Sequence, residues 1–157
     1  MNRHAMRGLI VQSLYHLEVG VNELDDVTRN VEEFVLSLKE KALNNPELKI
    51  NAEIIEREFT IEAYYNTTIE GILANLETID KLISDHLEGW SINRLNKVDK
   101  AILRLAVFEM MTTQTDHRIL INEAIELTKN YADTGDRKAP NFNNRLLDKI
   151  SQNLPKK

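Results

Sequence analysis

Several residue types are scarce or missing in this chain of 157 residues, and each absence narrows what the protein can be. It has no cysteine, which excludes disulfide bonds and thiolate metal ligands and fits a reducing compartment. No run of 18 apolar residues occurs, so we expect no membrane-spanning helix. The apolar start of the chain is interrupted by polar side chains, unlike a signal peptide. We therefore expect a cytoplasmic protein that does not enter the membrane.

The sequence motifs of common enzyme classes are also missing. There is no Walker loop, no G-x-G-x-x-G and no G-x-S-x-G nucleophile turn. The four histidines lie far apart and lack the spacing of metal ligands; they are His4, His16, His86 and His117. A short chain without these features favours a binding protein, with no catalytic residues, no cofactor and no metal.

What is present indicates an all-α fold. Five glycines, three prolines and few clusters of β-branched residues favour helices, and 42% hydrophobic residues suffice for a core. The apolar periodicity predicts seven helices, at residues 5–19, 23–43, 52–76, 77–87, 98–111, 122–131 and 142–153. We expect one domain made of two small packed bundles, at about residues 1–75 and 76–154.

Charge is distributed unevenly along the chain, whose net charge is -5. The acidic residues concentrate in residues 17–88, whereas both ends are net basic. Near the start, Arg3, His4 and Arg7 precede or open the first helix, and the two arginines share a helix face. They are either ordinary solvated charges or a small, salt-sensitive contact to phosphates.

The helix at residues 98–111 is expected to be central, because apolar residues fill more than half of its circumference. Leu103 and Val107 nevertheless fall on its polar arc, beside Asp99 and Arg104. They are either half-exposed residues under a neighbouring helix or a strip on which a partner docks. Glu109 falls on the apolar arc, which predicts a buried carboxylate bound by N–H groups, for example at the start of the next helix.

An aromatic residue, Phe142, stands where the polar stretch DRKAPN becomes an amphipathic helix. We expect Asn141 to cap this helix and the ring to lie at the edge of its apolar stripe, open towards Arg137 and Lys138. The ring is either a core anchor or a surface on which a base stacks. Asn143 falls inside the stripe, where an apolar residue is expected.

Three segments of the C-terminal half, taken together, resemble a known family. They are VDKAILRLAVFEM, INEAIELTKNYAD and NFNNRLLDKI, in this order. The opening RHAMRGLIVQSLY is similar to a basic first helix that ends in an aromatic residue. These segments resemble the NusB family of transcription antitermination factors.

The resemblance implies an all-helical, non-enzymatic protein of two bundles. Family members bind a single-stranded RNA element, boxA, in leader transcripts of ribosomal RNA operons. They do so together with NusE, which is also a small-subunit ribosomal protein. The pair joins NusA, NusG and RNA polymerase in a complex that resists termination. A homodimer of this chain remains an open possibility.

The resemblance also implies functional residues. RNA contacts are expected at Arg3, His4, Arg7, Gln12 and Phe142. Lys138 and Arg145 are added as candidate phosphate contacts. Arg145 replaces a glycine of the family, so it either adds such a contact or crowds a close approach of the backbone. For NusE, the matching positions are Tyr15 and Asp99, to which the strip of Leu103 and Val107 is added because it lies on the same polar arc as Asp99.

Two alternatives remain. One is an interaction protein that has kept the fold without the boxA site, because His4 stands where arginine is usual and Asn143 and Arg145 depart from the family pattern. The other is the RNA-binding domain of a ribosomal RNA cytosine methyltransferase, which has the same fold.

Overall fold

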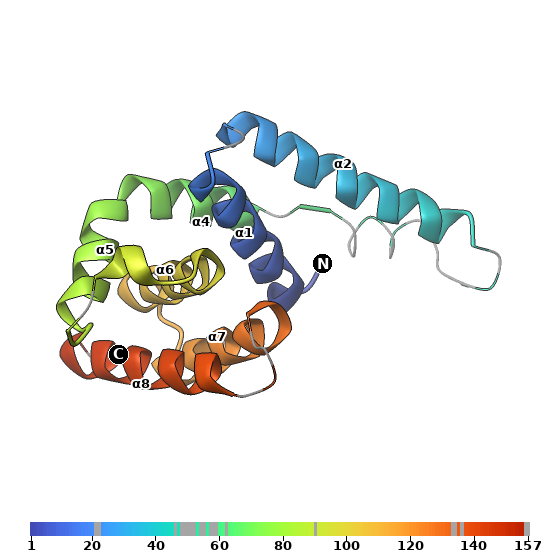
Figure 1. Cartoon of the computed structure of the whole chain (residues 1–157). Helices are drawn as coiled ribbons and strands as arrows, with labels where there is room; N and C mark the ends of the chain where they lie inside the picture. The colour runs from blue at the N-terminus through green and yellow to red at the C-terminus, as the bar shows by residue number, and fades with distance from the viewer. Residues whose placement is uncertain are drawn as a thin grey trace. The chain divides into compact units, whose positions relative to one another are not determined.

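The computed structural model is all-helical (Figure 1). It describes the chain apart from residues 21–22, 46, 48–52, 54–55, 57–59, 62, 90, 133–134, 136 and 156–157. The described part contains seven α-helices and one short 3-10 helix: α1 (Arg3–Glu18), α2 (Leu24–Leu43), α4 (Ala63–Ala74), α5 (Leu76–Asp85), η1 (Ile92–Arg94), α6 (Lys97–Thr112), α7 (His117–Tyr131) and α8 (Lys138–Asn153). The predicted all-α class is confirmed.

The chain divides into two compact units, Met1–Thr67 and Thr68–Lys157, with α4 running from one into the other. That the two units are bundles of one domain, meeting near residue 75, stays a prediction. The expected helix at residues 52–76 is present as α4 over its second half. Most of its first half lies outside the described residues.

In the first unit, α1 packs against α2. Helix α1 begins after Asn2, whose side-chain oxygen accepts a hydrogen bond from the backbone N–H of Ala5 at 2.8 Å. At its centre, Ser13 Oγ donates to the Leu9 carbonyl at 2.8 Å and lies 2.7 Å from the hydroxyl of Tyr65. Burial raises the pKa of that Tyr65 hydroxyl. This bond attaches the first turn of α4 to α1.

In the second unit, α6 is the central helix and contacts α5, α7 and α8. Its residues 100–107 are all buried, including the charged Lys100 and Arg104. Arg104 is tolerated there because its Nε and Nη2 each donate to one carboxylate oxygen of Asp80 on α5, both at 2.8 Å. The expected burial of Glu109 is confirmed. Its binding by N–H groups at the start of α7 stays a prediction.

The expected strip of Leu103 and Val107 is wrong, because both side chains are 0% exposed. On the helical wheel, the arc that holds Arg104 was assigned to the solvent because arginine is charged. The ion pair with Asp80 allows this arginine to be buried. Packing of α6 against three other helices covers the arc on which the strip lies. A partner protein therefore finds no surface at these two residues.

Helices α7 and α8 begin four or more residues earlier than expected. Helix α7 begins at His117 instead of residue 122, because Asp116 caps it by accepting from the N–H of Arg118 at 2.8 Å. Helix α8 begins at Lys138 instead of residue 142, with Pro140 in its first turn, where a proline breaks no intrahelical hydrogen bond. Asn141 therefore lies inside α8 and is not its cap.

Candidate nucleic-acid and partner interfaces

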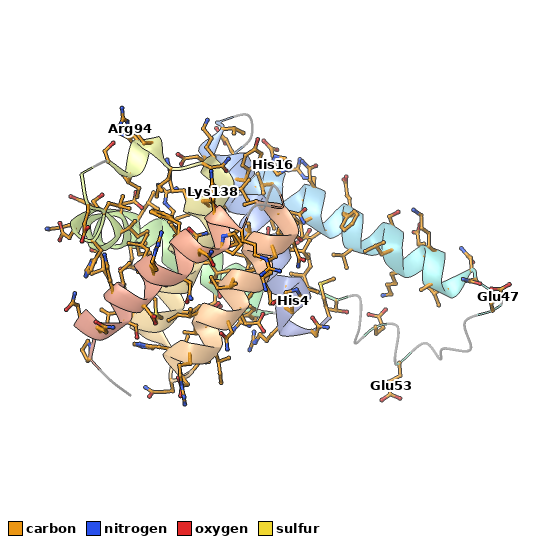
Figure 2. The ribbon with its side chains drawn as sticks, turned by 60° about the horizontal axis from the view of Figure 1, so that its bottom comes forward. His4, His16, Glu47, Glu53, Arg94 and Lys138 are labelled. Atoms are coloured by element: carbon orange, nitrogen blue, oxygen red, sulfur yellow. The ribbon has the colours of Figure 1, made fainter. Side chains whose placement is uncertain are left out.

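The basic residues at the start of α1 gather around one aromatic ring. The guanidinium carbon of Arg3 lies 3.7 Å from the centre of the Tyr64 ring, and that of Arg7 lies 6.0 Å from it. Arg3 is exposed, as is His4 on the same first turn (Figure 2). Arg7 is only 8% exposed. Arg3 and His4 can therefore reach a phosphate, whereas Arg7 mainly supports the ring beneath Arg3.

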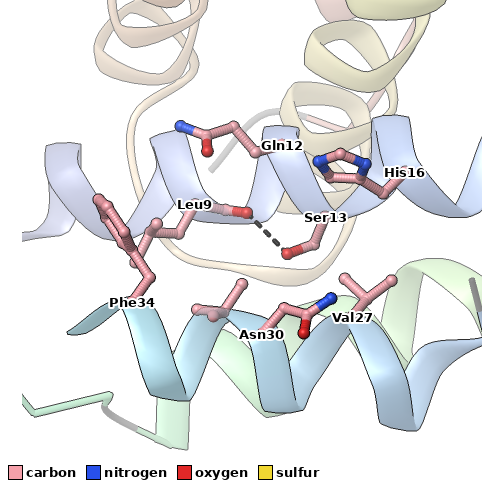
Figure 3. Close-up of a pocket in the computed structure, with 8 residues that line it drawn as sticks. Leu9, Gln12, Ser13, His16, Val27, Asn30 and Phe34 are labelled. Atoms are coloured by element: carbon pink, nitrogen blue, oxygen red, sulfur yellow. Dashed lines mark hydrogen bonds between the residues drawn. The ribbon is translucent and has the colours of Figure 1, made fainter. Parts of the chain in front are cut away.

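A groove between α1 and α2 lies further along the same unit (Figure 3). Its volume is about 150 Å³, and it is lined by Leu9, Gln12, Ser13, His16, Val27, Asn30, Val31 and Phe34. Gln12 and Tyr15 are exposed, so both predicted contact residues are accessible on α1. Phe34 is 53% exposed. The sequence did not indicate this groove.

In the second unit, Phe142 lies in the second turn of α8 and is partly exposed. Its ring lines a groove of about 370 Å³ that α8 forms with the end of α5. The cations Arg145 and Lys149 line the same groove, one and two turns further along α8. The sequence indicated the loop before α8 as the ring's surroundings and did not indicate α5. Lys138, at the start of α8, is exposed (Figure 2).

Hydrogen bonds and one ion pair hold several polar side chains of this groove. His86 Nδ1 lies 2.7 Å from the Leu82 carbonyl, which can only accept, so this nitrogen carries the proton. His86 Nε2 lies 2.7 Å from Nδ2 of Asn153. Lys149 Nζ is 3.1 Å from Glu88 Oε1. Arg145 is therefore the cation of the groove that no described carboxylate neutralises.

Directly after Phe142, the side chain of Asn143 is 0% exposed. Its Nδ2 donates to Asp99 Oδ1 on α6 at 3.2 Å and to Thr128 Oγ1 on α7 at 3.1 Å. The residue expected to be apolar thus has polar partners on two facing helices. Sequence reasoning missed this cluster. The signal available was that Asn143, Asp99 and Thr128 are polar residues on three helices of one bundle.

Asp99 lies at the partly exposed edge of this cluster, in the first turn of α6. Burial raises the pKa of its carboxyl group above the ordinary value of 3.8, and the hydrogen bond from Asn143 opposes that rise. A carboxylate held by one amide, at the positive end of a helix, presents its second oxygen as an acceptor for a cation.

We predict a pH dependence of stability from Asp99. Because its pKa is raised in the folded protein, the folded state retains a proton that the unfolded chain releases near pH 3.8. Stability should therefore fall as the pH rises from that value through the raised pKa. Urea unfolding of wild type and Asp99→Asn between pH 3 and 7 measures this difference. A constant difference across the range would contradict the prediction.

The described residues give no indication of another kind of site. They include no group of three histidine or carboxylate side chains arranged to hold a metal ion. Within the same residues, every helix is too short or too polar to span a membrane.

Comparison with known proteins identifies the fold and the family. The family model that matches is described as the NusB family and covers residues 4–152. This chain belongs to the NusB family. Transcription antitermination protein NusB of Helicobacter pylori strain Shi470 is 34% identical over 155 residues, which are 99% of this chain and 96% of that protein. The protein of the same name from a Nitratiruptor species is 32% identical over 152 residues, 97% of this chain and 93% of that one.

Solved NusB structures show the same fold. T. maritima NusB matches with a TM-score of 0.69 and 28% identity, covering 97% of this chain and 92% of that one. A crystal structure of antitermination factors NusB and NusE in complex with dsRNA matches with a TM-score of 0.69 and 25% identity, covering 97% of each chain. The predicted NusB resemblance is confirmed, and with it the expectation of a non-enzymatic protein.

Proposed function

We propose that this chain is a transcription antitermination factor that binds boxA-type single-stranded RNA of ribosomal RNA leader transcripts together with NusE. Similarity to NusB proteins over nearly the whole chain carries this proposal. The solved complex of a relative with NusE and RNA supports the choice of partners. Through them the chain joins NusA, NusG and RNA polymerase, which places it in the cytoplasm. The NusB match favours this role over that of a methyltransferase domain.

The groove at Phe142 is suited to single-stranded RNA. A base stacks on the exposed side of the ring, an interaction that requires the base to be unpaired. Arg145 follows one turn further along α8 and contacts a phosphate. Lys138, at the start of the same helix, adds a further cation. In the first unit, Arg3, His4 and Gln12 supply exposed polar contacts to RNA, while Arg7 supports the Tyr64 ring.

For NusE, exposed Tyr15 and the carboxylate of Asp99 are the proposed contacts. Tyr15 offers a large aromatic surface with a polar end, which is typical of residues at protein interfaces. Asp99 has a carboxylate oxygen left for a lysine or arginine of the partner. Leu103 and Val107 are no longer part of this proposal, because they are buried.

The alternative of an RNA-independent interaction protein has one observation in its favour. Arg7, one of the few cations at the start of α1, is only 8% exposed and so offers little surface to an RNA backbone. Two exposed basic residues, Arg3 and His4, then remain in that part of the first unit. The two functions differ in whether RNA binds at all, which one titration decides.

The test is a salt-titrated binding assay with labelled boxA RNA, with and without NusE. We expect NusE to tighten RNA binding and salt to weaken it, with a slope of roughly -0.7 per phosphate contact on a log–log plot. Asp99→Lys should weaken NusE binding, since it reverses the charge that meets the partner's cation. RNA binding that neither improves with NusE nor falls with salt would exclude the antitermination function.

A further inference from the structure

The amide of Asn143 joins three helices at one buried point. Thr128 Oγ1 donates its proton to the Ala124 carbonyl at 2.8 Å, so it can only accept from Asn143. The Asp99 carboxylate, when ionised, also only accepts. Both amide hydrogens of Asn143 are therefore used, one towards α6 and one towards α7. These two acceptors determine the orientation of the amide.

This orientation leaves the other end of the amide unsatisfied. Asn143 Oδ1 is buried and has no hydrogen-bond partner among the described residues. A buried acceptor without a donor lowers stability, and an apolar side chain of the same size would avoid that cost. Packing of α8 alone therefore does not account for an asparagine here. The amide supplies what an apolar residue cannot, a directed bond to the Asp99 carboxylate.

That bond links the two surfaces of the proposed function. Asp99 is partly exposed at the start of α6, and its Oδ1 is held by Asn143, which directs Oδ2. Asn143 directly follows Phe142, so the same bond also restrains the turn of α8 that carries the ring. Whatever immobilises Asp99 also immobilises this turn, and a second ligand then loses less conformational entropy when it binds.

We propose that Asn143 is a positioning residue that couples the partner-binding carboxylate of Asp99 to the RNA-binding turn at Phe142. A cation of NusE on Asp99 then strengthens RNA binding on α8. Because coupling between two binding sites is reciprocal, RNA strengthens NusE binding by the same factor. This inference rests on the proposed function and adds how its two ligands cooperate within the second unit.

The experiment uses Asn143→Leu, which keeps the shape of the side chain and removes both donors. Its matched control, Thr128→Val, breaks the other bond of the same amide and leaves the bond to Asp99. The dissociation constant of boxA RNA is measured with and without saturating NusE. We expect Asn143→Leu to reduce the gain from NusE by about 5-fold or more, while Thr128→Val retains it. An equal gain in wild type and Asn143→Leu would overturn the coupling, even if both affinities fall.

A second measurement needs neither ligand and separates failure of this inference from failure of the proposed function. Asp99→Ala breaks the same bond from its partly exposed end, so it remains usable if Asn143→Leu does not fold. We expect it to shift the NMR signals of the Phe142 ring in the unliganded wild-type background and not in the Asn143→Leu background. Unchanged Phe142 signals in the wild-type background would overturn the positioning role. Loss of RNA binding by wild type would instead overturn the proposed function.

Discussion

Replacing Asp80 by alanine should lower the free energy of unfolding by about 3–5 kcal/mol, the largest effect expected from any single change described for this chain. The Arg104 side chain is only 10% exposed, and two hydrogen bonds from its guanidinium end on Asp80. Without that carboxylate, the buried guanidinium loses the acceptors of two hydrogen bonds and a compensating negative charge. Equilibrium unfolding in urea, followed by circular dichroism, measures the loss.

A matched control exists on the same helix. Asp85 forms an ion pair with Lys81 at 3.0 Å, but both side chains are more than half exposed. Asp85→Ala should therefore change the free energy of unfolding by about 0.5 kcal/mol or less. Equal effects of the two substitutions would show that the buried pair of Arg104 and Asp80 stabilises the fold no more than the exposed pair does. The contribution of Asp80 to the packing of α6 against α5 would then be no larger than that of a surface charge.

Replacing Phe142 by alanine should weaken boxA RNA binding roughly 5- to 150-fold, the range expected when one base loses its stacking partner. The ring lines the groove of the second unit next to Arg145, so its loss removes the apolar contact and leaves the phosphate contact. The salt dependence of binding should therefore stay nearly unchanged. Fluorescence anisotropy at several salt concentrations separates the two contributions.

Two variants control this experiment. Phe34→Ala removes a more exposed phenylalanine from the first unit, one that is not among the proposed RNA contacts, and should leave RNA affinity within about 2-fold of wild type. Phe142→Leu keeps an apolar side chain on α8 without an aromatic face, and should bind RNA nearly as weakly as Phe142→Ala. If Phe142→Leu binds like wild type, the ring serves packing and not stacking.

Helix periodicity, read from the sequence, was sufficient for the fold class. Helices α2 and α6 begin and end within one residue of the expected positions, because long amphipathic segments show where their apolar faces start and stop. The sequence predicted less accurately where a helix begins when a capping residue sets that start. Asp116 caps α7, which begins five residues before the expected start, and a first turn of mixed polarity carries no periodic signal.

For the candidate site residues too, the sequence indicated the exposure of some and not the burial of others. Exposure of Arg3, His4, Gln12 and Tyr15 agrees with what the opening helix indicated, since residues near a chain start with polar neighbours usually remain solvated. The burial of Arg7 could not be read from the sequence. It depends on Tyr64, which is far from it along the chain and approaches its guanidinium only after folding.

The sequence by itself therefore determined the all-helical fold, the order of the helices and the family. Only the tertiary structure decided which polar residues are solvated. Arg104 looks like a surface residue along its helix, and Asn143 looks out of place in an apolar stripe. Both are buried because Asp80, Asp99 and Thr128 on neighbouring helices accept their hydrogen bonds. A helical wheel describes one helix, whereas the cost of burying a polar group depends on partners from other helices. For the same reason Leu103 and Val107 are core residues, and Asn143 is the link between Asp99 and Phe142.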